Sequence, residues 1–362
     1  MKLEQIDKNF KIEEGNVDGL IEYSLPNDNF GIYGIFYDKE RGSFARAPYT
    51  FTKQFGIGLD TMAGTTAGGR IKFSTDSMKL GLKVKWRRLI RMNHMPLTGS
   101  IGFYLLEELD NGKRIFIKPF MATMSDENGM VHNVEFSDVV RPGYSQKKMR
   151  NFIIYCPLYN EFIEEISIFL EKDAKVNSGK SYKDVKPILY YGNSVTQGGC
   201  VSRPDNAFPA LIEQWTNVDF INLGFSGNAK GEPEMAEYLS KIECSIFVCD
   251  YDENAPNVEH LLKTHLPLYR TFRKAQPNTP IVFISKPVAR IDFGNVRARN
   301  DVIYNTYKTA KDEGDENVYF IDGVNFFKED AEFCTVDGCH PNDLGHYKMA
   351  KAIYPVITSI LK

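Results

Sequence analysis

Residues 190–198 read YYGNSVTQG, and this stretch decides how the second half of the chain folds. An apolar run over residues 187–191 leads into a turn of small residues around Ser194, and residues 206–215 have the pattern of a helix. A buried strand that breaks into such a turn before a helix presents the intervening side chain at the carboxyl edge of its sheet, where ligands bind in open α/β folds. A backbone N–H in the turn can also face a developing oxyanion. Ser194 is therefore a candidate nucleophile, and a plain strand-to-helix turn is the alternative interpretation.

A second motif lies far downstream, where residues 335–346 read TVDGCHPNDLGH. A serine hydroxyl needs a general base, usually an imidazole, and a carboxylate holds that imidazole in the required tautomer. Asp337 precedes His340 by three residues in a turn with a glycine and a proline, so the carboxylate and the imidazole can converge on one site. An isolated Asp-x-x-His pair is typical of a surface turn. The order Ser194, Asp337, His340 favours a catalytic triad instead.

At four places the sequence resembles the SGNH (GDSL-type) hydrolases. GNSVTQG at 192–198 and DGCHP at 337–341 are similar to the first and last sequence blocks of that family. NLGFSGN at 222–228 is similar to the block whose glycine N–H lines the oxyanion hole. DYDEN at 250–254 stands where the family has an asparagine whose side-chain amide is a further donor. The chain departs from the family pattern in two places. Asn193 stands where an aspartate is usual, and the block DYDEN at 250–254 lacks its usual glycine.

The resemblance covers roughly residues 185–362, and it implies a serine esterase that uses the triad described above. It places the oxyanion hole on the N–H groups of Ser194 and Gly227 and on the side-chain amide of Asn254. Gly224 is the second choice for the glycine donor. The resemblance also implies a three-layer α/β/α fold around a parallel sheet.

The length of 362 residues suggests two domains, because a single core rarely grows beyond about 250–300 residues. In residues 1–170, short aromatic and β-branched runs separated by turns predict a β-sandwich or jelly roll. GFYL at 102–105 resembles a degraded Gly-x-Asp-Leu-Tyr motif, which belongs to an N-terminal β-domain fused to one SGNH subgroup. Residues 171–181 are polar and unpatterned, as in a linker. We therefore expect an N-terminal sandwich with its linker at 1–180 and a catalytic domain at 181–362.

Beyond that boundary, apolar runs alternate with amphipathic segments, which predicts a parallel sheet covered by helices on both faces. The predicted strands are 187–191, 218–223, 245–250, 280–285 and 317–321. The predicted helices are 206–216, 231–242, 257–276, about 294–313 and about 344–361.

Composition argues against several classes of partner. The net charge of −3 gives no reason to expect nucleic acid or an anionic membrane. No apolar run approaches the roughly 18 residues of a membrane span. Residues 1–8 contain acidic residues and no apolar core, so they do not read as a secretory signal, and we expect a cytoplasmic protein. An exported protein with its signal removed would look the same.

The six cysteines are dispersed, and several lie in apolar runs as buried thiols do. This distribution fits a reducing compartment better than a disulfide scaffold. Cys334 and Cys339 flank Asp337 and could pair in an exported protein. Together with His340 they also suggest a metal site, but the Cys-x4-Cys-His spacing fits no common zinc pattern. We therefore expect no metal and no organic cofactor.

The predicted activity is hydrolysis of carboxylic esters. SGNH enzymes that resemble this chain and carry an N-terminal β-sandwich often remove acetyl or other short acyl groups from carbohydrates. The resemblance thus implies a small-molecule or oligosaccharide acyl ester as substrate. Arg290, in the loop after the fourth predicted strand, is a candidate substrate contact. Four aromatic residues could stack on sugar if exposed, with core packing as the alternative: Tyr49, Phe51, Phe55 and Trp86.

Three other functions fit part of this pattern. A lipase or thioesterase would act on longer acyl chains. A non-catalytic carbohydrate-binding protein could retain the hydrolase fold, and a structural protein could use its β-rich half for assembly. The presence of Ser194, Asp337 and His340 argues against the last two, because an inactive site would be free to lose them. The sequence indicates no oligomeric state.

Overall fold

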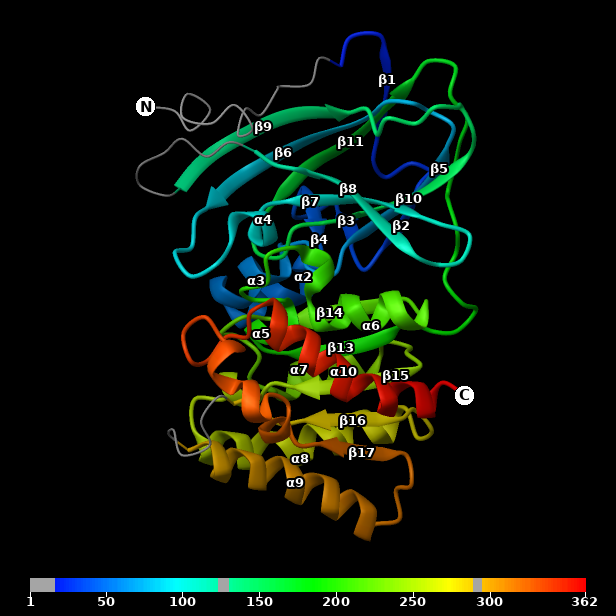
Figure 1. The fold of residues 1–362 in the computed structure, drawn as a ribbon. Helices are drawn as coiled ribbons and strands as arrows, with labels where there is room; N and C mark the ends of the chain where they lie inside the picture. The colour runs from blue at the N-terminus through cyan, green and yellow to red at the C-terminus, as the bar shows by residue number, and fades with distance from the viewer. Residues whose placement is uncertain (1–16, 123–129, 289–294) are drawn as a thin grey trace.

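The computed structural model describes residues 17–122, 130–288 and 295–362. Antiparallel sheets from the first half of the chain lie on an α/β unit built by the second half (Figure 1). This arrangement confirms the predicted fold class, a β-sandwich followed by a three-layer α/β/α unit with a parallel sheet. Within these described ranges, no helix is both long and apolar enough to cross a bilayer.

The first half folds as strands because buried and half-exposed side chains alternate along it. β6 (Leu80–Ile90) buries Leu82, Val84 and Trp86, while the lysines between them are half-exposed. Two antiparallel sheets pack such apolar faces against each other. The first sheet has the order β1 (Leu20–Ser24), β11 (Ile163–Glu171), β6 and β9 (Met130–Val140). The second has the order β12 (Val176–Asn177), β5 (Arg70–Thr75), β10 (Arg150–Tyr155), β7 (Phe103–Glu108) and β8 (Arg114–Phe120), and β2 (Gly31–Tyr33) also pairs with β5.

Shorter elements complete this half, and several of them lie on the side that meets the α/β unit (Figure 1). They are β3 (Phe36–Asp38), β4 (Ser43–Ala45), α2 (Tyr49–Thr52), α3 (Ile57–Ala63) and α4 (Leu97–Ser100). The predicted domain boundary near residue 180 stays a prediction. The described strands end at Asn177 and resume at Ile188.

The second half forms a parallel sheet in the order β14-β13-β15-β16-β17. Every predicted strand and long helix of this half is present, and each begins and ends within two residues of its predicted bounds. The strands are β13 (Ile188–Gly192), β14 (Phe220–Gly224), β15 (Ile246–Asp250), β16 (Ile281–Ile284) and β17 (Val318–Ile321). The helices are α5 (Ser194–Gln197), α6 (Phe208–Thr216), α7 (Pro233–Ser240), α8 (Val258–Ala275), α9 (Val296–Asp312) and α10 (Asp343–Ile360).

The two faces of this sheet are covered by different helices. Successive side chains of a strand point to opposite faces, so Tyr190 joins one core and Tyr191 the other. Helices α6 and α10 cover the face of Tyr190, and α7, α8 and α9 cover the face of Tyr191. Each strand is therefore buried on both sides, as expected for a parallel sheet.

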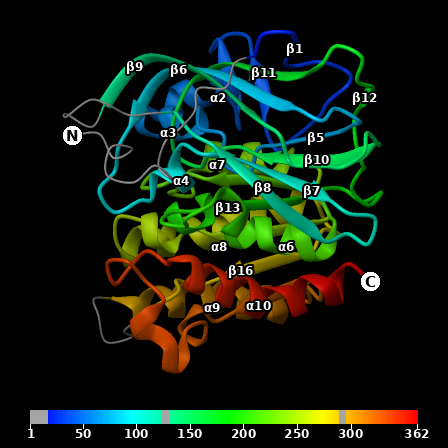
Figure 2. The same cartoon turned by 45° about the horizontal axis from the view of Figure 1, so that its top comes forward.

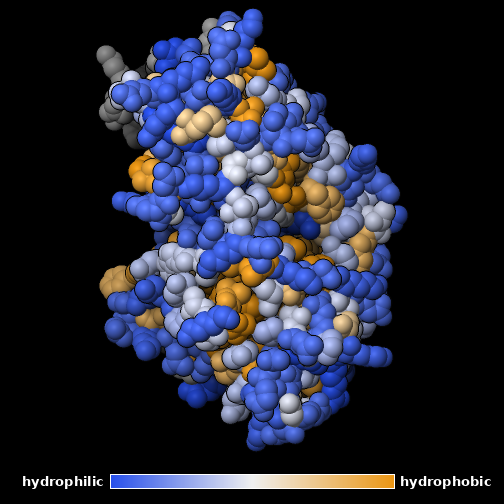
Figure 3. All heavy atoms as spheres, turned by 90° about the vertical axis from the view of Figure 1, so that its right-hand side faces the viewer, coloured by the Kyte–Doolittle hydropathy of each residue, from blue (hydrophilic) through white to orange (hydrophobic). Residues whose placement is uncertain are grey.

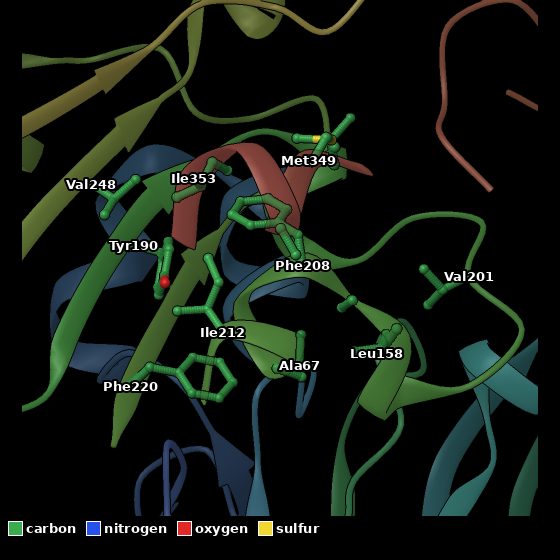
Figure 4. Close-up of a cluster of buried hydrophobic side chains, with 14 of the residues drawn as sticks. Ala67, Leu158, Tyr190, Val201, Phe208, Ile212, Phe220, Val248, Met349 and Ile353 are labelled. Atoms are coloured by element: carbon green, nitrogen blue, oxygen red, sulfur yellow. The ribbon is translucent and has the colours of Figure 1, made fainter. Parts of the chain in front are cut away.

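Helix α6 lies between the parallel sheet and the sandwich, so one apolar core spans both halves of the molecule (Figures 1 and 2). In Figure 4, Phe208 and Ile212 of α6 lie among side chains from β13, from α10 and from the N-terminal half. On the face shown in Figure 3, hydrophobic side chains gather at mid-height, between hydrophilic ends. The two halves therefore form one continuous packed body.

The edge of the parallel sheet is covered by arginines of the N-terminal half. β14 is the edge strand, and an edge strand leaves alternate carbonyls unpaired. Arg70 donates to the carbonyl of Phe220 through Nη1 at 3.2 Å and Nη2 at 3.1 Å. Arg46 Nη1 donates to the carbonyls of Asn222 at 2.8 Å and Gly224 at 2.7 Å. Two buried guanidinium groups thus replace a neighbouring strand along this edge.

Candidate active site

Ser194, Asp337 and His340 lie in one chain of hydrogen bonds. Ser194 is the first residue of α5, directly after β13, and its Oγ lies 3.0 Å from Nε2 of His340. Nδ1 of His340 lies 2.7 Å from Oδ2 of Asp337. Because the carboxylate only accepts, Nδ1 carries the proton and Nε2 is left to accept from the serine hydroxyl. The structure therefore places the predicted nucleophile, base and acid in the order that acyl transfer requires.

The turn between β17 and α10 keeps Asp337 ionised. Partial burial raises the pKa of Asp337, but hydrogen bonds outweigh that effect and lower the pKa to about 2. The donors are the backbone N–H and the ring of His340 and the backbone N–H of Cys339. A carboxylate that accepts several such bonds stays charged throughout the neutral range. Asp337 is therefore a charged partner for the imidazole of His340.

The turn that carries Ser194 is fixed by its neighbours. Asn193 caps α5, and its Oδ1 accepts from the N–H of Val195 at 2.8 Å and of Thr196 at 3.3 Å. A side chain at Gly192 would meet Oγ1 of Thr196 at 2.2 Å, so only glycine fits at the end of β13. Short polar caps satisfy the first N–H groups of a helix. The position of the serine follows from this local packing.

Asn193 stands where the SGNH pattern usually has an aspartate, and the structure gives a reason for the amide. Its Nδ2 donates to Oδ1 of Asp250 at 3.5 Å, while Thr196 Oγ1 donates to Oδ2 of the same carboxyl at 2.9 Å. Burial and the neighbouring Asp252 raise the pKa of Asp250. An aspartate at position 193 would bring another carboxyl to this buried site, whereas an amide can accept on one side and donate on the other.

Gly227 and Gly224, the two glycines considered for the oxyanion hole, differ in whether their N–H is free. The N–H of Gly224 donates to Oδ1 of Asn222 at 2.9 Å, so it is already used. The N–H of Gly227 has no hydrogen-bond partner among the described residues, nor does that of Ser194. Gly227 has φ +69, a conformation that favours glycine. This contrast favours Gly227 over Gly224 as the donor.

Asn254 ends the short 3₁₀ segment Asp252–Asn254 that follows β15. Its Oδ1 accepts from the N–H of Ala229 at 3.4 Å, in the loop that also carries Gly227. With its oxygen bound in this way, the amide leaves Nδ2 without a partner in the part of the chain that the structure describes. The arrangement supports Asn254 as a side-chain donor, a role that stays a prediction.

The N-terminal half reaches the backbone of the same loops. Tyr159 Oη donates to the carbonyl of Ser194 at 2.9 Å. Gln197 of α5 donates from Nε2 to the carbonyl of Leu158 at 2.9 Å and accepts at Oε1 from the N–H of Ser226 at 3.0 Å. Sequence analysis identified none of these contacts, because they join side chains to backbone groups rather than to complementary side chains.

Other residues of interest have different positions. Arg290, the predicted substrate contact, lies outside the described residues. Trp86 is fully buried and stacks on Phe136 inside the sandwich, so it is no sugar platform. Phe51 stacks on Tyr238 of α7, where the two halves meet. All six cysteines are free thiols.

Two family models match the chain, one in each half. Residues 185–358 match the model described as "GDSL-like Lipase/Acylhydrolase family". Residues 22–176 match the model GxDLY, described as "N-terminus of Esterase_SGNH_hydro-type", in agreement with the weak motif at 102–105. No curated protein matches the sequence.

Solved structures of similar fold cover nearly the whole chain. A protein from Bacteroides ovatus assigned as a GDSL-like lipase is 27% identical, with a TM-score of 0.82, over 94% of this chain and 98% of its own. The salicylyl-acyltransferase SsfX3 from a tetracycline biosynthetic pathway is 16% identical, with a TM-score of 0.72, over 95% of this chain and 98% of its own. A family two carbohydrate esterase from Clostridium thermocellum, solved with cellohexaose, is 13% identical, with a TM-score of 0.60, over 91% and 99%. The last two share the fold alone.

Proposed function

Because the chain belongs to the SGNH (GDSL-like) esterases that carry an N-terminal GxDLY domain, we propose that it hydrolyses short acyl esters with Ser194 as nucleophile. The observation that supports this proposal best is the continuous hydrogen-bond chain from Ser194 Oγ through His340 to Asp337. The chemistry requires no metal or organic cofactor.

The first half of the reaction follows from this geometry. His340 Nε2 takes the hydroxyl proton as Ser194 Oγ attacks the ester carbonyl. The resulting oxyanion accepts hydrogen bonds from the N–H of Ser194, the N–H of Gly227 and Nδ2 of Asn254. The imidazolium, stabilised by Asp337, then returns the proton to the leaving alcohol.

In the second half, His340 removes a proton from water, which attacks the acyl-enzyme, and the acid product leaves. This step uses the same donors, because the second tetrahedral intermediate places its oxyanion where the first one did.

For the substrate, we propose an acetyl or similar short acyl group on a carbohydrate. This proposal draws on structural neighbours described as carbohydrate esterases, among them an acetyl xylan esterase from Butyrivibrio proteoclasticus that is 14% identical. A lipase or thioesterase acting on longer chains remains the alternative, as does a carbohydrate-binding protein without activity. The similarity to SsfX3 adds a further alternative, in which the acyl group is transferred to an acceptor other than water.

A fluorophosphonate labelling experiment tests the nucleophile. The wild-type protein should be labelled on Ser194 and should release acetate from p-nitrophenyl acetate, and Ser194→Ala should lose both. Cys339→Ser changes a neighbouring nucleophile and is the matched control, which should keep the label. A wild-type protein that neither takes the label nor hydrolyses p-nitrophenyl acetate would overturn the proposal. The alternative would then be a carbohydrate-binding protein without activity.

Substrate class is tested with the same protein. Nitrophenyl esters of increasing chain length and acetylated oligosaccharides should show highest kcat/KM for the short acyl groups. A maximum at long chains would indicate a lipase or thioesterase. Faster consumption of the ester in the presence of an alcohol or sugar acceptor, with ester product formed, would indicate acyl transfer.

A further inference from the structure

His94, Cys200 and His340 form a cluster of two imidazoles and one thiol at the active site. One ring nitrogen of each histidine and Sγ of Cys200 lie within 4.8 Å of one another. The rings of His94 and His340 are 5.6 Å apart between centroids. His94 comes from the segment between β6 and α4, Cys200 from the loop after α5, and His340 from the turn before α10. Three distant parts of the chain, from both domains, therefore meet here.

The two members outside the triad lack other partners. In the described ranges, neither His94 nor Sγ of Cys200 makes a hydrogen bond, and Cys200 forms no disulfide. Cys200 is only 4% exposed and has φ +70, a backbone conformation that residues other than glycine rarely adopt. An unpartnered buried thiol beside two imidazoles is a donor set without an evident structural task.

We propose that His94, Cys200 and His340 bind a zinc ion, and that the bound ion blocks the active site because it coordinates the catalytic imidazole. Zinc prefers nitrogen and sulfur ligands, with bonds of about 2.0–2.3 Å in tetrahedral geometry. Such bonds separate the ligand atoms by roughly 3.3–3.6 Å, whereas the three atoms lie within 4.8 Å of one another, so they must approach by up to about 1.2–1.5 Å. The exposed side chain of His94, which no hydrogen bond holds, can supply that movement. The fourth position is open to water.

The triad already has the arrangement of a metal-binding histidine. Asp337 Oδ2 accepts from Nδ1 of His340, which leaves Nε2 as the ligand atom. Carboxylate–histidine–zinc arrangements of this kind fix the tautomer and raise the basicity of the ligand. On binding, Nε2 gives its lone pair to zinc instead of accepting from Ser194, and the Cys200 thiol releases its proton to solvent.

Two consequences follow. Zinc should inhibit reversibly, because the base that activates Ser194 is occupied. Zinc affinity should rise with pH, because the Cys200 thiol must lose its proton when it binds the ion. The inhibition rests on the proposed esterase function, whereas the binding itself does not.

The binding test uses full-length Ser194→Ala protein, so it does not depend on hydrolysis. Calorimetric titration with zinc chloride should give one ion per chain. Adding His94→Ala or Cys200→Ser should weaken the affinity by at least about 10–100-fold. Mutation of a residue that only hydrogen-bonds to a metal ligand already has an effect of this size. His132→Ala removes another exposed histidine of the N-terminal domain and is the matched control, which should bind as before. Equal affinity in the His94 variant, or no binding at all, would overturn the proposal.

The inhibition test uses proteins with an intact serine. The readout is the zinc concentration that halves each variant's own rate of p-nitrophenyl acetate hydrolysis, so differences in basal turnover do not matter. His94→Ala, a surface change that spares the core, should raise that concentration in step with its loss of affinity, and EDTA should restore the wild-type rate. Zinc that binds as predicted without inhibiting would overturn the assignment of His340 as a ligand.

Discussion

The two domains meet at the active site, and they contribute to it in different ways. Every atom of the proposed chemistry comes from the C-terminal domain, from loops at the carboxyl edge of β13, β14 and β15 and from the turn before α10. The N-terminal domain instead contacts the backbone that carries those atoms, through Arg46 and Tyr159. The comparison teaches that a domain can shape a site without presenting a reacting group to it.

The physical basis of this difference is the open edge of β14. The carbonyls of Asn222 and Gly224 point away from the sheet and need donors, which Arg46 supplies. Arg46 is fully buried, and burial lowers its pKa to about 9. Its guanidinium also packs on the ring of Phe225, 5.2 Å from the centroid. The strand end that leads to Gly227 is therefore held by the other domain.

The largest effect in this comparison is expected in the C-terminal domain, from Asn254→Ala. Loss of one oxyanion donor typically lowers kcat by about 10²–10³-fold. Folding should change little, because Asn254 is half-buried and its oxygen makes only one long bond of 3.4 Å. Steady-state kinetics with p-nitrophenyl acetate and thermal unfolding measure the two effects. A decrease of less than about tenfold would exclude Asn254 from the oxyanion hole.

The next largest effect is expected from Arg46, and it distinguishes the carboxyl end of β14, which Arg46 covers, from the amino end, which Arg70 covers. Arg46→Met leaves the carbonyls of Asn222 and Gly224 unsatisfied, which should lower the free energy of unfolding by about 2–6 kcal/mol, at about 1–3 kcal/mol for each buried group. Because Gly224 leads into the loop that carries Gly227, the proposed oxyanion donor, kcat should also fall, and Arg46→Lys should restore part of it. Urea unfolding and kcat on the folded fraction measure both.

Arg70→Met is the matched control, since Arg70 covers the carbonyl of Phe220 at the other end of the same strand. This variant should lose stability while it keeps kcat. An equal loss of kcat in both variants would show that the edge acts through overall stability and not through the loop beside the site.

The two domains should also differ in acid. His265 and His346 are buried in the C-terminal domain, and burial lowers their pKa values to about 3 and about 4. The unfolded chain takes up these protons near pH 6.5, so their contribution to stability is complete above that pH and is lost as pH falls toward 4. The expected slope is about 1.4 kcal/mol per pH unit for each histidine.

Amide hydrogen exchange at pH 5 and pH 7, corrected for intrinsic rates, would locate that loss. Protection should fall more in the helices that carry the two histidines, α8 and α10, than in the sandwich strands. His346 matters most for the site, because it accepts from the N–H of Phe208 at Nδ1 and contacts the carbonyl of Gly199, next to the α5 turn, at Nε2. Equal changes in both domains would show that they unfold in acid as one unit.

Much of the C-terminal domain could be predicted from sequence, because its information is local. The spacing of apolar residues predicted the strands and helices, and short motifs placed Ser194, Asp337 and His340 on one edge of the sheet. The contacts of Arg46 could not be predicted in the same way. Its partners are backbone carbonyls, which every residue has, so no complementary charge in the sequence identifies them. His94 was missed for a related reason, since only the packing of the two domains brings it to His340.

The smallest effect is expected from Tyr159→Phe, which removes another contact between the N-terminal domain and the site. The hydroxyl donates to the carbonyl of Ser194, but that carbonyl also accepts from the N–H of Gly199 at 2.8 Å and of Gly198 at 3.2 Å. It therefore stays satisfied, and the loss should be about 0.5–1.5 kcal/mol of stability, with little change in kcat. A decrease in kcat as large as that of Arg46→Met would mean that the whole interface, and not the β14 edge alone, positions the nucleophile.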